Sequence, residues 1–252
     1  MYATYGARVS SVIIINLHPL FSAYSVAAFH FAEFIPQFLT SVIYFLVFFL
    51  ASVLICIPLA FYYQHAGQFL GEIGVSNPAG KMTVGQVSEV LFLLLLPYFF
   101  KRFGFKMTIM AAMLAWALRY MFFAIASGGE ETYILLLGIA LHGICYDFFF
   151  VSGQIYTDSK AGAAYKSAAQ GLITLATYGC GMLIGFWVAG KITDSFILEE
   201  TGHDWQTIWI YPAAFAFLVM VLFLLLFKNE KIAYQRSTER RIRAALAQEP
   251  HR

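Results

Sequence analysis

Long apolar runs separated by short polar segments set the pattern of this chain. About 20 apolar residues are enough for a helix to cross the hydrocarbon core of a bilayer. Unbroken runs favour helices, because the strands of a membrane barrel alternate apolar and polar residues over about 10 positions. The pattern predicts six spanning helices, at residues 39–74, 83–100, 107–126, 133–156, 167–192 and 207–227.

These helices divide the chain into three parts. The six-helix domain covers residues 39–227, and a charged tail of residues 228–252 follows it. Residues 1–38 form a separate N-terminal segment. Its apolar part, residues 11–31, is interrupted by one proline and two histidines, so that a spanning, an interfacial and a re-entrant placement all stay open.

The composition supports a membrane protein. The residues are 60% hydrophobic and 12% charged, whereas soluble domains carry about 25% charged residues. The predicted fold class is therefore an all-α integral membrane protein. Cys56, Cys145 and Cys180 lie within apolar runs and lack the spacing of metal ligands or of a disulfide framework. No catalytic motif is apparent, so we expect no catalytic residues, no metal, no other cofactor and no enzymatic activity.

The loop charges predict the orientation of the helices. Basic residues gather in the loops at 101–106 and 157–166 and in the tail, whereas the loops at 127–131 and 193–206 are acidic. Basic loops stay on the cytoplasmic side of a membrane. We therefore expect a multi-pass protein of the plasma (inner) membrane with a cytoplasmic C-terminus. The basic tail is typical of contact with anionic lipids and does not indicate nucleic acid binding.

An acid in the middle of an apolar helix is the most unusual feature. Asp147 costs roughly 2.5–3.5 kcal/mol at membrane depth, which favours a functional role. His142, Tyr146 and Asp147 fit on one side of a helix, within an arc of roughly 140°. Burial favours the neutral form of a carboxyl group, so Asp147 is suited to taking up and releasing a proton. The alternative is a structural ion pair with Arg119, which also lies inside a helix core.

Further polar side chains lie on neighbouring predicted helices. Gln86 and Glu89 are three residues apart and share a helix face, although Glu89 alone is equally explained by contact with the outer headgroups. Gln64 ends the first apolar run, and its amide needs partners once it is buried. Amides and acids that project from several helices towards the midplane suit the binding site of a carrier.

Other singular residues have structural explanations. Gly181 and Gly185, four residues apart, predict close packing against another helix. Four aromatic residues are typical of the belts that anchor helices at a membrane surface, namely Tyr62, Tyr63, Trp205 and Trp209.

The order of the motifs resembles the C-terminal half of a nucleoside:proton symporter of the major facilitator superfamily. The resemblance covers about residues 47–228, and its specificity lies in the ordered set. The matching stretches are 61–64 (FYYQ), 86–92 (QVSEVLF), 97–104 (PYFFKRFG), 113–120 (MLAWALRY), 143–149 (GICYDFF), 152–153 (SG) and 168–172 (AAQGL).

This resemblance implies that the six predicted helices are the seventh to the twelfth of a twelve-helix carrier. It implies that amides and acids hydrogen-bond the ribose and the base, that Tyr146 stacks on the base, and that Glu89 or Asp147 carries the coupled proton. The implied substrate site is lined by Gln64, Gln86, Glu89, Tyr146 and Asp147. His142, which we also place in this site, stands where the pattern has an aromatic hydroxyl, and Gly67 stands where it has an amide.

A carrier of this superfamily holds its site between two six-helix halves, and this sequence contains one. The expected partners are therefore a nucleoside, a proton, the lipid bilayer, and an N-terminal half supplied by a longer chain or by another chain. Two other functions stay open, a carrier of another small polar solute such as a sugar, and a non-transporting membrane scaffold or subunit.

Overall fold

The computed structural model describes residues 39–127, 132–198 and 202–228. The chain divides into two compact units, Met1–Tyr44 and Phe45–Arg252, and apart from the first six residues of the first helix everything below concerns the second unit. The predictions for residues 11–31 and for the tail beyond residue 228 lie outside the described residues.

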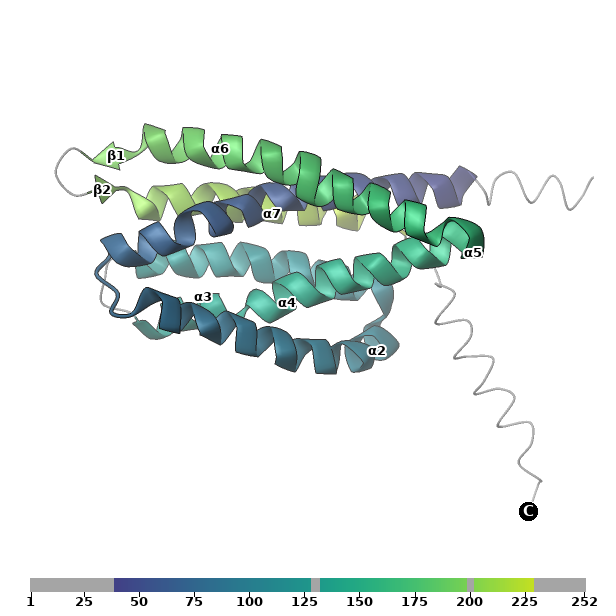
Figure 1. The fold of residues 1–252 in the computed structure, drawn as a ribbon, viewed down its shortest axis with the longest axis horizontal. Coiled ribbons are helices and arrows are strands. Elements are labelled where there is room, and N and C mark those ends of the chain that lie inside the picture. The colour runs from purple at the N-terminus through teal and green to yellow at the C-terminus, as the bar shows by residue number, and fades with distance from the viewer. Residues whose placement is uncertain (1–38, 128–131, 199–201, 229–252) are drawn as a thin grey trace, which may run out of the picture. The chain divides into compact units, whose positions relative to one another are not determined.

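Nearly all of the described chain is helical (Figure 1). It begins with the helix Leu39–Glu72 and ends with α7, Trp205–Leu226. The elements between them are α2 (Pro78–Ala126), α3 (Thr132–Ala140), α4 (His142–Tyr146), the π-helix η1 (Asp147–Val151), α5 (Ser152–Thr174), the π-helix η2 (Leu175–Gly181), α6 (Met182–Ser195), β1 (Ile197–Leu198) and β2 (Gly202–His203).

Two of the long helices are folded back on themselves. α2 has 49 residues and the helical stretch Tyr133–Ser195 has 63, so straight helices would be about 74 and 95 Å long, more than twice the roughly 30 Å of a hydrocarbon core. Gly104 (φ 77°) and Gly162 (φ 69°) interrupt them in a conformation that favours glycine. α2 and α5 each turn back on themselves (Figure 1). The four long apolar helices therefore form six helical passes, which confirms the predicted all-α fold.

A short hairpin replaces part of the loop predicted at residues 193–206. Ile197 pairs with His203 in an antiparallel arrangement. The carboxylate of Glu72, at the end of the first helix, accepts hydrogen bonds from the backbone nitrogen of His203 at 3.1 Å and from Trp205 Nε1 at 2.8 Å. One acidic side chain thus ties the end of the first helix to the segment that leads into α7.

The prediction that Trp205 and Trp209 anchor the chain at the membrane surface is wrong. Their side chains are 3% and 0% exposed. Trp209 stacks on Tyr120 of α2, with ring centroids 5.6 Å apart and planes at 6°, and both tryptophans pack edge-on against Phe69 of the first helix. The large rings fill the space between three helices, which a composition rule for membrane surfaces does not anticipate.

Close helix packing at Gly181 and Gly185 is confirmed. A Cβ atom on Gly181 would lie 2.8 Å from the carbonyl oxygen of Val53, and one on Gly185 would lie 2.6 Å from Cβ of Ala60. Both distances are shorter than van der Waals contact, so these glycines allow η2 and α6 to approach the backbone of the first helix.

Gly143 permits a still closer contact, between α4 and α2. A Cβ atom there would lie 2.4 Å from the carbonyl oxygen of Ser88. The helix is interrupted at Leu141, and the backbone nitrogen of Gly143 donates to Ser88 Oγ at 2.9 Å. Gly143 follows His142 in α4, and Ser88 precedes Glu89 in α2. The contact therefore sets how closely the side chains of His142 and Glu89 approach one another.

We expect Gly143→Ala to lower the stability of the folded chain by about 1–3 kcal/mol, the usual cost of overpacking a close contact. The matched control is Gly71→Ala, because a Cβ atom on Gly71 meets nothing within 4 Å. Thermal unfolding of both variants in detergent checks the prediction, and equal melting temperatures would contradict it.

Candidate functional site

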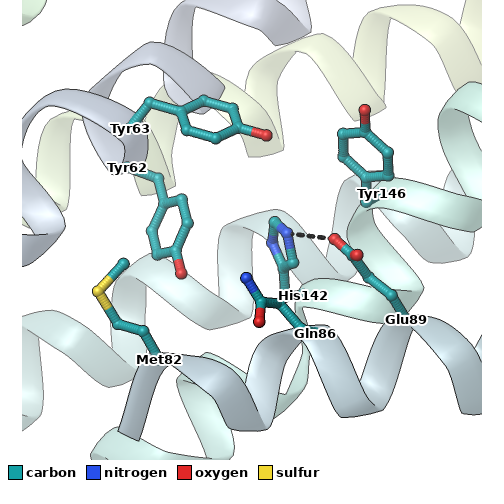
Figure 2. Close-up of a pocket in the computed structure, with 7 residues that line it drawn as sticks. All are labelled: Tyr62, Tyr63, Met82, Gln86, Glu89, His142 and Tyr146. Carbon is teal, nitrogen blue, oxygen red and sulfur yellow. Dashed lines mark ion pairs between the residues drawn. The ribbon is translucent and has the colours of Figure 1, made fainter. Parts of the chain in front are cut away.

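A polar cavity of about 360 Å³ opens between the first helix, α2 and α4, within the size range of small-molecule sites. Its walls combine three tyrosines and a methionine with an amide, an acid and an imidazole (Figure 2). The lining residues are Tyr62, Tyr63, Met82, Gln86, Glu89, His142 and Tyr146.

Helical periodicity brings these side chains to one place. Met82, Gln86 and Glu89 follow one another at steps of four and three residues along α2, so they share one face. His142 and Tyr146 are four residues apart on α4, and Figure 2 shows the Glu89 carboxylate and the His142 ring pointing toward one another from the two helices. The structure thus brings together four polar residues that the sequence predicts to share a site, namely Gln86, Glu89, His142 and Tyr146. Met82 lines the same cavity.

A hydrogen bond and an ion-pair contact connect Arg119, through His142, to the cavity wall. Arg119 Nη1 lies 2.5 Å from His142 Nδ1, and His142 Nε2 lies 2.6 Å from Glu89 Oε1. His142 is 6% exposed, whereas the Glu89 side chain is 32% exposed. These contacts therefore lead from the interior of the bundle to the cavity wall.

Arg119 is fully buried. Its guanidinium carbon lies 3.6 Å from the centroid of the Tyr62 ring, a cation–π contact. Within the described residues no ion pair joins Arg119 to Asp147, and the predicted structural pair is therefore not formed. Arg119 instead contacts His142, which in turn contacts the Glu89 carboxylate. The close approach of α4 to α2 brings these three side chains together.

Asp147 does not line this cavity, although it follows Tyr146 directly. It begins the π-helix η1, about 100° further round the helix than Tyr146. The residue is 5% exposed, and its Oδ2 atom has no hydrogen-bond partner among the described residues. The predicted shared face thus holds for His142 and Tyr146 but not for Asp147.

Gln64 also lies outside the cavity. Its side chain is exposed, and its Nε2 atom lies 3.5 Å from the position of a Cβ atom on Gly190 of α6. The neighbouring residues Tyr62 and Tyr63, whose pattern predicts anchors at the membrane surface, line the cavity instead. Sequence reasoning also missed Met82, although its spacing to Gln86 and Glu89 is a usable signal.

The two π-helices meet beside the cavity. The hydroxyl groups of Tyr146, which precedes η1, and Tyr178, in η2, lie 2.6 Å apart. Single π-turns inside α-helices are frequent at functional sites. This contact links Tyr146, in the cavity wall on α4, to the π-helix η2.

The comparison with protein families decides the identity. The profile described as Nucleoside H+ symporter matches residues 37–232. The chain belongs to this family. YegT of Escherichia coli (strain K12) is 44% identical over 192 residues, which are 73% of this chain and 45% of YegT. The xanthosine permease of the same strain is 34% identical over 176 residues, which are 68% of this chain and 42% of the permease.

The solved structures agree with this assignment. A crystal structure of the nucleoside transporter NupG matches with a TM-score of 0.64 and 28% identity, covering 79% of this chain and 50% of NupG. The match supports the predicted fold of the major facilitator type. The chain spans less than half the length of the curated relatives it matches.

The two acids should respond differently to replacement by amides. Asp147→Asn removes a carboxylate whose buried oxygen lacks a partner, so we expect stability equal to wild type or higher by about 1 kcal/mol. Glu89→Gln removes the negative charge that Arg119 reaches through His142, so we expect a loss of about 1–2 kcal/mol. Chemical unfolding in detergent measures both, and the opposite order of stabilities would refute the assignment of partners.

Proposed function

We propose that this chain forms one half of a nucleoside:proton symporter and carries one wall of the substrate cavity. The observation that supports the proposal most is the polar cavity around Glu89, His142 and Gln86 inside the apolar bundle of a nucleoside symporter family member. Two relatives are named xanthosine permease and nucleoside permease, which favours a nucleoside as the solute.

The cavity residues are chemically suited to a nucleoside. The Glu89 carboxylate accepts hydrogen bonds from hydroxyl and N–H groups, and the Gln86 amide both donates and accepts. The aromatic rings of Tyr62, Tyr63 and Tyr146 line the same space, where a base can stack on them. A sugar ring also packs its C–H face on aromatic rings, so the names of the relatives, and not the tyrosines, favour a nucleoside over a sugar.

The coupled proton has two candidate carriers, Glu89 and Asp147. Glu89 is at the cavity wall, where a proton and the solute share one space. Asp147 is buried with one oxygen unpartnered among the described residues, and a neutral carboxyl is the less costly form in such surroundings. We propose Glu89 as the group that meets the solute and Asp147, which is buried and does not line the cavity, as the group that carries the proton.

The remaining wall of the cavity is proposed to come from a second six-helix half, part of the same protein or another chain. Tyr63 is 51% exposed, and the Glu89 side chain is 32% exposed. If this side of the cavity faced lipid, the exposed carboxylate of Glu89 would be unfavourable. Two halves with the site between them are the usual arrangement in this superfamily. The basic residues in the loops at 101–106 and 157–166 support the proposal of a cytoplasmic C-terminus.

Uptake measurements test the function. The chain is produced with an N-terminal half of a family member in cells that lack nucleoside uptake, and uridine, adenosine, xanthosine and a sugar panel are supplied with and without a proton gradient. We expect gradient-dependent nucleoside uptake that Glu89→Gln lowers about 10–100-fold, since a hydrogen bond to a charged group contributes about 1.5–3 kcal/mol.

Gly71→Ala is the control for expression and folding, and we expect it to leave uptake unchanged. Uptake of sugars without nucleosides would replace the proposal by a carrier of another polar solute. Absence of any uptake, with both halves inserted in the membrane, would favour a non-transporting subunit.

A further inference from the structure

The contact of Arg119 with His142 fixes which nitrogen of the imidazole carries the proton. A guanidinium group only donates, so His142 Nδ1 must accept from Arg119 Nη1. A neutral imidazole with an accepting Nδ1 carries its proton on Nε2. His142 Nε2, which carries this proton, lies 2.6 Å from Glu89 Oε1 in an ion-pair contact, so this oxygen of Glu89 faces a polar N–H group.

Arg119 has few polar contacts other than the one with His142. Its Nε and Nη2 atoms have no hydrogen-bond partner in the described part of the chain, and Tyr62 covers one face of the guanidinium group. No carboxylate of the described residues lies within ion-pair distance of it. The positive charge thus acts on Glu89 through the imidazole between them.

Glu89 keeps one oxygen for the cavity. Oε1 is occupied by His142, and Oε2 has no protein hydrogen bond among the described residues. Figure 2 shows the carboxylate beside the His142 ring and below Tyr146, with one oxygen on the dashed line and the other away from it. A solute that fills the cavity meets this second oxygen.

We propose that Arg119 is a positioning residue that acts through His142 to hold Glu89 as an obligate acceptor, so that the cavity selects solutes that donate a hydrogen bond at this point. The ligand part rests on the proposed function. For a nucleoside, the donors are the ribose hydroxyls or a base N–H group, and an analogue without the ribose 2′ and 3′ hydroxyls lacks the first of these.

The tautomer of His142 tests the positioning step without any solute. Full-length chain with ¹⁵N-labelled histidine is placed in lipid nanodiscs, and the signal of His142 is assigned by its disappearance in His142→Gln. We expect a neutral ring protonated at Nε2 in wild type and in Arg119→Lys, which keeps a charged donor. The Glu89 carboxylate also favours a proton on Nε2, so Arg119→Met is measured in combination with Glu89→Leu. This double variant should lose the preference, and an unchanged tautomer in it would overturn the proposal.

Solute discrimination tests the consequence for binding. We expect wild type, assembled with the N-terminal half used for the uptake measurements, to bind uridine at least about 10-fold more tightly than 2′,3′-dideoxyuridine, which corresponds to one hydrogen bond to a charged group. His142→Phe should reduce this ratio to about 3-fold or less. His142→Gln can accept from Arg119 and donate to Glu89 in the same order, so we expect it to keep most of the ratio.

The outcomes separate the two proposals. Equal ratios in His142→Phe and His142→Gln, with both variants folded by their melting curves, would overturn the positioning role. If wild type has the expected tautomer but binds neither nucleoside, the proposed function fails while the positioning of Glu89 by Arg119 is supported. If His142→Phe does not fold, the comparison of Arg119→Lys with the variant that combines Arg119→Met and Glu89→Leu decides.

Discussion

A fully buried guanidinium group inside an apolar helical bundle is the constraint on which the cavity depends. Burying a charge is costly unless it is paired and hydrogen-bonded. In this protein the compensation for Arg119 is indirect, because the neutral ring of His142 stands between it and Glu89. The carboxylate can therefore stay at the cavity wall, where a direct salt bridge to Arg119 would draw it into the core.

This arrangement needs backbones that approach closely. Gly143 brings α4 against α2 next to His142, and the interruption at Leu141 frees the backbone nitrogen of Gly143 for Ser88. On the other side, Gly181 and Gly185 bring the following helix against the first one. Helix association in lipid depends on such close packing, because lipid tails are as apolar as the side chains and no hydrophobic force drives the helices together.

The two acids in the bundle illustrate how local geometry separates similar residues. Glu89 lies on a face with Gln86 and Met82 and reaches the cavity. Asp147 opens a π-turn and is buried with an unpartnered oxygen among the described residues. In a carrier, one group at the solute and one buried outside the cavity would give the proton and the solute separate but adjacent positions, and the proposed symport requires that kind of coupling.

The sequence alone determined the helical fold, the number of crossings, and the gathering of Gln86, Glu89, His142 and Tyr146, because apolar run length and helical periodicity are local properties of the chain. Only the tertiary structure decided the partner of Arg119, the turn of Asp147 away from the cavity, the exposure of Gln64, and the burial of Trp205 and Trp209. Each of these depends on how closely two helices approach or on a π-turn, and neither is encoded in the spacing of residues along a single helix.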